Sequence, residues 1–183
     1  MRMRKREWTR TADQAVEPWS LLRDAVLPGA VAGTLGAFVM ALLACAFTGV
    51  LHGEPWRPAM RVAGLFFRSG ETQGAGVALV GVLTHFAVAG GLATGFALLL
   101  PRKGTGVAAL LLGELYSLGA WLLMTRLLLP FGSPPLARED ASALLLLLHL
   151  AFGAALGTVP AARGVLTRVD RLRHGLRLLR QKA

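Results

Sequence analysis

Two histidines in long uncharged stretches are the first residues of this chain that could do chemistry. His85 and His149 lie about ten and about eight residues from the same side of their stretches, so at about 1.5 Å per helical residue they reach a similar depth. Neutral imidazoles can ligate a haem iron axially, relay protons or hydrogen-bond between helices. The sequence leaves these three roles open.

A second group of polar side chains shares one face of another apolar stretch. Glu114, Ser117 and Trp121 follow the i, i+3, i+7 spacing of a single helix face. A charged carboxylate in lipid costs at least about 3 kcal/mol, so Glu114 should face the interior and find a partner or carry a proton. Trp121 should lie near the depth of the histidines, with Glu114 about 10 Å nearer the cytoplasm. We therefore predict one intramembrane polar cluster of His85, Glu114, Ser117, Trp121 and His149.

Patterns typical of catalytic and metal sites do not occur in the sequence. It has no Gly-rich phosphate loop, no paired-carboxylate motif and no His-Glu-x-x-His helix. The single cysteine, Cys45, allows neither an internal disulfide nor a cysteine metal cluster. We expect no catalytic residue, no metal site, no enzyme activity and no cofactor, with haem b at the two histidines as the alternative.

Four apolar stretches must position these side chains. They run over about 25–51, 75–100, 106–129 and 141–159, close to or above the roughly 20 residues that cross a bilayer. Prolines or charges bracket all four, as is typical of helix ends. The short link at 104–106 predicts that the second and third stretches are antiparallel neighbours. The sequence therefore predicts an all-α protein, an integral membrane four-helix bundle.

Basic residues are distributed unevenly over the two sides of these spans. Fifteen of the twenty Lys and Arg residues lie on the side of the termini and five on the other side. This bias predicts that both termini are cytoplasmic. A composition dominated by Ala, Gly, Leu and Arg is common in bacterial proteins, so we expect a multi-pass protein of the bacterial inner membrane.

The segments outside the spans are basic or amphipathic. We divide the chain into a basic N-terminal segment (1–24), a transmembrane domain (25–160) and a basic amphipathic tail (161–183), with an interfacial helix expected within 55–68. Because the basic residues directly adjoin apolar spans, anionic lipid headgroups are the expected partners, and nucleic acid is not. The tail arginines expected to contact lipid are Arg168, Arg171, Arg173, Arg177 and Arg180.

Small residues recur at four-residue spacing in every span. Lipid tails are as apolar as Leu, so membrane helices associate where small side chains let their backbones approach. The glycines predicted to pack helices on this ground are Gly29, Gly33, Gly91, Gly95, Gly113, Gly153 and Gly157.

Several short groups of residues occur together in the last three spans. They are Thr84-His85-Phe86, Gly90-Gly91 and Gly95-Phe96, then Gly113, Tyr116, Trp121 and Pro130, then His149, Phe152-Gly153 and Gly157. In these groups, over residues 28–160, the chain resembles a family of uncharacterised small four-span bacterial inner-membrane proteins, a domain of unknown function. The resemblance implies the fold and a recurring pair of intramembrane histidines, and it implies no substrate. Glu114 has no match in that pattern.

The function expected on these grounds is that of a non-enzymatic structural or accessory subunit of a membrane assembly. Its expected partners are membrane lipids and other membrane proteins or a second copy. One alternative is a small transporter or proton-conducting protein that uses His85, Glu114 and His149. Another is a b-type haem protein with His85 and His149 as axial ligands.

Overall fold

Helices make up nearly all of the described chain. The computed structural model describes residues 19–67, 73–132 and 142–182, with the side chains of residue 142 and residues 174–182 outside that description, and the described part contains no strand. Four helical segments are long and apolar enough to cross a membrane: Leu22–His52, Ala75–Leu99, Gly106–Phe131 and Ala143–Arg173. The predicted all-α, four-span architecture is confirmed, and the chain is a multi-pass membrane protein.

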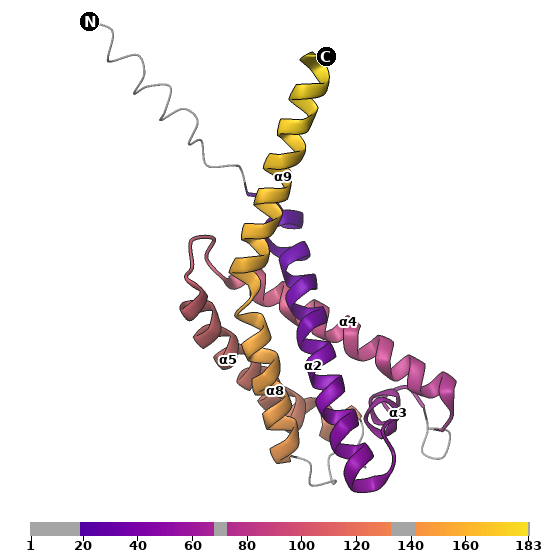
Figure 1. Ribbon diagram of the computed structural model, residues 1–183. Coiled ribbons are helices and arrows are strands. Elements are labelled where there is room, and N and C mark those ends of the chain that lie inside the picture. Colours follow the sequence, from indigo (N-terminus) through magenta and orange to yellow (C-terminus); the bar gives the residue numbers. More distant parts are fainter. Residues whose placement is uncertain (1–18, 68–72, 133–141, 183) are drawn as a thin grey trace, which may run out of the picture.

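The elements follow one another in a simple order (Figure 1). A π-helical turn η1 (Leu22–Val26) leads into α2 (Leu27–His52), followed by α3 (Arg57–Ala63) and α4 (Ala75–Leu99). Helix α5 (Gly106–Leu123) continues through the π-helical turn η2 (Met124–Leu128) into α6 (Leu129–Gly132). Helices α8 (Ser142–Leu156) and α9 (Val159–Lys182) complete the chain.

Local sequence explains where these helices begin and end. The hydroxyl of Thr105 accepts a hydrogen bond from the Ala108 N–H at 3.2 Å, which caps the first turn of α5. Helix α2 ends at Gly53, whose φ of 70° is the left-handed conformation that glycine adopts without steric cost. The first span begins at Leu22, so the predicted boundary at residue 24 falls inside a helix.

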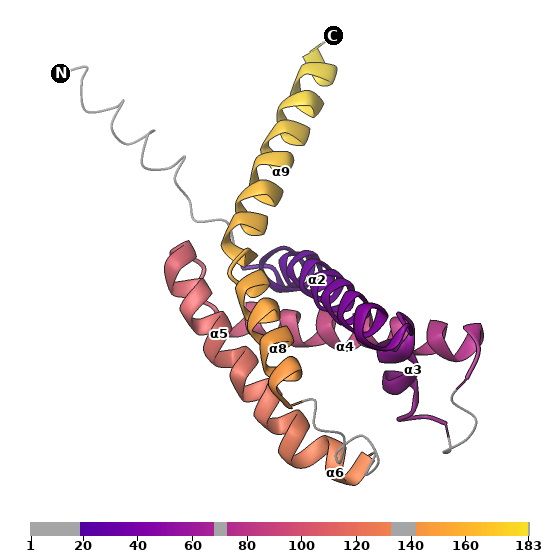
Figure 2. The same cartoon turned by 60° about the horizontal axis from the view of Figure 1, so that its bottom comes forward.

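The helices pack in two close pairs, α2–α4 and α5–α8, and α2 contacts α8 to join the pairs. Helix α2 contacts both α4 and α8, α5 packs along α8, and the short α3 lies against α4. Helices α4 and α5 diverge from the link that joins them (Figures 1 and 2). The two spans are consecutive, but the prediction that they pack as antiparallel neighbours is wrong over most of their length. Gly113 and Gly153 direct α5 against α8 instead.

The α2–α4 pair meets at glycines. A methyl group on Gly29 would come within 2.6 Å of the Thr94 Cα, and one on Gly33 within 2.8 Å of the Ala89 carbonyl oxygen. These distances are shorter than any real Cβ contact, so larger residues would separate the two backbones. Close approach through glycine is the expected device for helix association in lipid.

The α5–α8 pair uses the same device. A Cβ on Gly113 would lie 2.6 Å from the Gly153 carbonyl oxygen, and one on Gly157 would lie 3.2 Å from the Leu110 Cα. Gly95 differs from these because its nearest neighbour is the Tyr116 hydroxyl, at 3.1 Å. Gly91 is exposed, and no described atom lies within 4 Å of the place its Cβ would take. Gly91 therefore does not pack helices, because it lies on the outer face of α4.

Small apolar residues fill the interior and large ones cover the outside. Twelve of the eighteen buried apolar residues are Ala, whereas Leu, Val and Phe dominate the exposed large side chains of the described chain. The largest members of the core cluster are Phe96 and Phe152. An aqueous globule would bury its leucines, so this inverted distribution fits a bundle whose outer surface faces lipid.

The helical segment that contains the fourth predicted stretch continues past Pro160 to Arg173. Helix α8 stops at Leu156, and after a two-residue turn α9 resumes at Val159 with Pro160 in its first turn. Proline is tolerated there because first-turn N–H groups have no intrahelical partner. Figure 1 shows α9 continuing away from the bundle at the end where the described chain begins. Beyond the turn, α9 projects from the other helices (Figure 1).

Candidate functional site

The predicted polar cluster lies among α2, α4, α5 and α8, and most of its members bond to backbone carbonyls. His85 Nε2 on α4 lies 3.0 Å from the Ala37 carbonyl oxygen of α2. A carbonyl can only accept, so Nε2 must carry the proton and donate it. This hydrogen bond links the first and second spans, and its acceptor residue, Ala37, belongs to the buried core cluster.

Helices α5 and α8 are joined by a hydroxyl. Ser117, fully buried, donates a hydrogen bond from its hydroxyl to the His149 carbonyl oxygen. The ring of His149 is itself buried, and its Nδ1 donates to the Leu145 carbonyl oxygen one turn earlier, at 2.8 Å. His149 therefore bonds within its own helix through its ring and to the neighbouring helix through its backbone.

Tyr116 supplies the polar link between α4 and α5. Its hydroxyl donates to the Leu92 carbonyl oxygen at 3.0 Å, and its ring packs on Phe96 with centroids 5.5 Å apart. Tyr116 was not one of the five residues of the predicted polar cluster. Its phenol lies where α4 and α5 still approach one another, close to Gly95.

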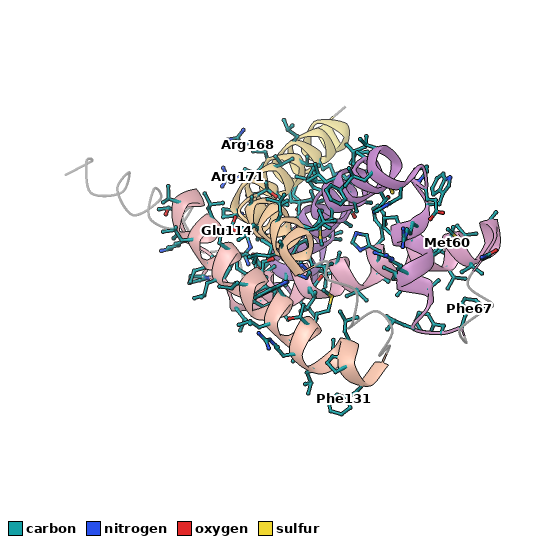
Figure 3. The ribbon with its side chains drawn as sticks, turned by 90° about the horizontal axis from the view of Figure 1, so that it is seen from below. Met60, Phe67, Glu114, Phe131, Arg168 and Arg171 are labelled. Atoms are coloured by element: carbon teal, nitrogen blue, oxygen red, sulfur yellow. The ribbon has the colours of Figure 1, made fainter. Side chains whose placement is uncertain are left out.

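Glu114 and Trp121 are the two members of the predicted cluster that each have a buried polar atom without a hydrogen bond. Among the described residues, Glu114 Oε2 and Trp121 Nε1 are the buried side-chain polar atoms without a hydrogen-bond partner. A Cβ on Gly153 would lie 2.7 Å from that Glu114 oxygen, so the carboxyl group packs against the backbone of α8. Figure 3, which views the bundle from below, shows Glu114 between α5 and α8.

The arrangement of the two histidines bears on haem binding. For iron ligation through Nε2, His85 would have to give up its hydrogen bond to Ala37 and change tautomer. The core around Ala37 is closed by Phe152 and Ala93, and Gly36 lies so close to the Phe152 ring that a Cβ would clash at 2.5 Å. These residues do not fit a macrocycle between the histidines. No group of three or more His, Cys, Asp or Glu side chains suited to a metal ion occurs among the described residues.

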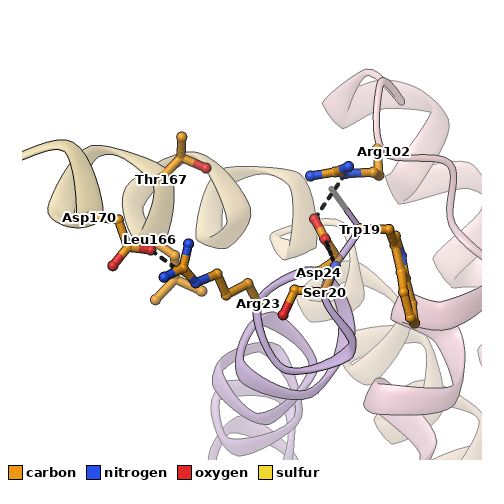
Figure 4. A pocket seen from close by; sticks show the side chains of 8 residues that line it. All are labelled: Trp19, Ser20, Arg23, Asp24, Arg102, Leu166, Thr167 and Asp170. Carbon is orange, nitrogen blue, oxygen red and sulfur yellow. Dashed lines mark hydrogen bonds and ion pairs between the residues drawn. The ribbon is translucent and has the colours of Figure 1, made fainter. Parts of the chain in front are cut away.

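A second polar site, which no sequence motif indicated, lies at the end of the bundle where the described chain begins. Asp24, buried, forms an ion pair with Arg102 at 3.0 Å and accepts a hydrogen bond from the Ser20 N–H at 2.8 Å. Arg23 pairs with Asp170 of α9 at 3.4 Å. The first span, the α4–α5 link and α9 are thus connected by charges (Figure 4).

Arg163 completes this charged end by binding carbonyl groups. Its guanidinium donates to the carbonyl oxygens of Ala97 (2.5 Å), Leu100 (3.2 Å), Pro101 (3.1 Å) and Asp24 (2.8 Å). Carbonyls at the C-terminal end of a helix lack intrahelical partners and carry partial negative charge. A planar guanidinium with five donors suits such a group of acceptors. Arg163 therefore caps α4 and fixes the base of α9 to it.

One signal in the sequence could have identified this end. Asp24, Arg102 and Arg163 each stand within a few residues of the end of an apolar stretch, and Asp24 is an acidic residue among basic ones.

The tail arginines that were predicted to contact lipid lie on α9. Arg168, Arg171 and Arg173 are exposed, and Figure 3 shows Arg168 and Arg171 on the outer side of α9. The side chains of Arg177 and Arg180 lie outside the described residues.

Comparison with known proteins adds no relative. No family model, no curated protein and no solved structure matches this chain.

Proposed function

We propose that this protein is a non-enzymatic accessory or structural subunit of a membrane assembly. The observation that supports this proposal is how the intramembrane polar groups are used. His85, Tyr116 and Ser117 each donate to a backbone carbonyl of a neighbouring helix. Groups used in this way hold helices in register and are not free to bind a substrate.

The location proposed is the bacterial inner membrane, with both termini in the cytoplasm. Its support is the excess of Lys and Arg on the side of the termini. On the same side, the pair of Arg23 and Asp170 joins the start of the first span to α9. The proposed partners are lipids and other membrane proteins or a second copy, which would meet the large apolar side chains on the outside of α4 and α5.

The test compares assembly with transport in the same variants. The chain is extracted from its native membrane in mild detergent, and the mass of the particle is measured for the wild type, His85→Ala and Glu114→Ala. A particle heavier than the monomer, weakened by His85→Ala without any solute or proton flux in liposomes, is expected. An intact particle with a flux that both substitutions abolish would overturn the proposal.

A second candidate function, proton conduction, rests on Glu114 alone. Its buried Oε2 lacks a hydrogen-bond partner, and an intramembrane carboxyl group is the usual element of a proton path. Proton uptake into liposomes under a potassium-diffusion potential tests it, with Glu114→Gln against Ser117→Ala as the matched α5 control. Uptake that Glu114→Gln removes and Ser117→Ala retains would establish this function.

A third measurement addresses haem. An absorption spectrum of the purified protein, oxidised and then reduced, is expected to show no Soret band because His85 Nε2 is committed to Ala37. A Soret band that His85→Ala or His149→Ala removes would mean that the bundle opens to admit a haem.

A further inference from the structure

A pocket opens among the charged residues at the end of the bundle. Its volume is about 480 Å³, which is in the range of small-molecule sites. Its walls come from the start of the first span (Trp19, Ser20, Arg23 and Asp24), from the α4–α5 link (Arg102) and from α9 (Leu166, Thr167 and Asp170). Figure 4 shows these side chains around the opening.

The pocket lies where the spans leave the hydrocarbon. The first apolar segment begins at Leu22, between the wall residues Ser20 and Arg23, and the second ends at Leu99, three residues before Arg102. Trp19 is 57% exposed, as expected of an indole at the boundary between apolar lipid and water. A ligand in this pocket would therefore be at the depth of lipid headgroups.

The charges that line the pocket balance. Two arginines, Arg23 and Arg102, face two aspartates, Asp24 and Asp170. Of the two ion pairs, the Asp24–Arg102 pair is the more firmly held, because Asp24 is buried and also accepts a hydrogen bond from the Ser20 N–H. The Arg23–Asp170 pair is longer, at 3.4 Å, and its side chains are 54% and 30% exposed. Such an exposed pair is weak and can exchange partners with a ligand.

We propose that this pocket binds the headgroup of an amino-phospholipid, whose phosphodiester is anionic and whose primary ammonium is cationic. The phosphodiester would accept hydrogen bonds from Arg23, because a guanidinium matches phosphate oxygens in geometry and charge. The ammonium would donate to Asp170, and the hydroxyl of Thr167 lies in the same wall. A purely anionic headgroup that took Arg23 would leave Asp170 without a cation, because Arg102 stays paired with Asp24, so the zwitterion is the better complement.

Lipid binding to the full-length protein, delipidated in detergent, tests this proposal by native mass spectrometry. The probes are phosphatidylethanolamine, phosphatidylcholine and phosphatidylglycerol of the same acyl chains. We expect the ethanolamine lipid to bind about tenfold more tightly than the choline lipid, whose quaternary ammonium cannot donate a hydrogen bond to Asp170. Equal binding of these two lipids, or tighter binding of phosphatidylglycerol, would overturn the proposal.

Two variants and one control assign the effect to the pocket. Asp170→Asn is expected to remove the preference for ethanolamine over choline, and Arg23→Gln to weaken both lipids about tenfold. Arg57→Gln, in the ion pair with Glu54 that follows α2 and lies outside the pocket walls, should leave both values unchanged. Because the preference is a ratio measured on the folded fraction, partial unfolding of a variant does not imitate its loss. A preference that survives Asp170→Asn would refute the assignment.

One further probe separates a lipid from a free headgroup. Soluble phosphoethanolamine carries the same phosphate and ammonium but no acyl chains. It is expected to displace the lipid only when in large excess, since the apolar chains contribute through the adjoining spans. Displacement at concentrations equal to those of the lipid would assign the pocket to a soluble zwitterion and would overturn the lipid proposal.

Discussion

The interior of the bundle and its charged end use polar side chains in different ways. Inside, single hydrogen bonds from His85, Tyr116 and Ser117 reach carbonyls that already belong to helices. At the charged end, Arg163 alone binds four carbonyls, and Asp24 is held by both an arginine and an N–H group. This chain therefore concentrates its strongest polar contacts where water begins, and relies on close backbone packing where lipid surrounds it.

The physical reason lies in what each group loses on being buried. A lone hydroxyl or imidazole in the membrane gains only a modest amount from a hydrogen bond, because the separated helices also find partners for it. Charged side chains must keep most of their solvation, so they gather at the helix ends and replace water with one another. The two regions should therefore respond to substitution by different amounts.

The largest effect is expected for Arg163→Ala. It leaves the carbonyls of Ala97, Leu100 and Asp24 without their charged donor, and the free energy of unfolding should fall by about 3 kcal/mol. Unfolding by sodium dodecyl sulfate in mixed micelles, followed by circular dichroism, measures it. Arg168→Ala, an exposed arginine five positions along the same helix, is the control and should change stability by less than about 0.5 kcal/mol. An equal loss in the free energy of unfolding for Arg163→Ala and Arg168→Ala would show that Arg163 does not stabilise the end of α4.

Asp24→Asn is expected to have the second largest effect. The substitution keeps the size of the side chain but removes the charge that pairs with Arg102. We expect a loss of about 2 kcal/mol in the free energy of unfolding, measured in the same way. Asp170→Asn provides the comparison in an exposed pair, and a larger loss there than in Asp24→Asn would contradict the distinction between a fixed and an adjustable pair.

Ser117→Ala is expected to cost less than either change at the charged end. It removes the hydroxyl that donates to the His149 carbonyl, and intramembrane hydrogen bonds contribute about 0.6 kcal/mol on average and at most about 1.7 kcal/mol. Unfolding in mixed micelles again measures the change. Gly113→Leu, four residues earlier on α5, sharpens the comparison because it would push α5 away from α8. If Ser117→Ala costs more than Gly113→Leu, hydrogen bonds rather than packing hold this pair.

The smallest effect is expected for Asp170→Asn. Its partner Arg23 is about half exposed, and exposed ion pairs contribute roughly 0.2–1 kcal/mol. Raising the salt concentration should erase the difference between the variant and the wild type, since salt screens exposed charges. The measurement is the stability difference at about 0.05 M and about 1 M salt. A difference that is independent of salt would show that Asp170 acts through something other than its charge.

The sequence predicted the spans better than the contacts between them. The lengths of the apolar stretches depend on local composition alone, and the first three segments lie within a few residues of their predicted bounds. The fourth begins at Ala143, near its predicted start, but its helical segment extends to Arg173. The sequence did not indicate that the helical segment continues past Pro160 into α9. A proline can follow the end of one helix or lie in the first turn of the next, and the conformation of the residues around it decides between the two. The sequence singled out His85, Ser117 and His149, whose side chains bond to backbone carbonyls in the bundle. Asp24, Arg102 and Arg163 appeared in the sequence only as flanking charges.

Composition and spacing by themselves determined that this chain is helical, spans a membrane four times and packs through small residues. They could do so because the bilayer imposes one length and one polarity on every span. Only the tertiary structure decided that Arg163 caps α4, that α5 leaves α4 for α8 and that His85 donates to Ala37. Those outcomes depend on the rotation and crossing angle of each helix. Many residues set these together, and no local pattern encodes them.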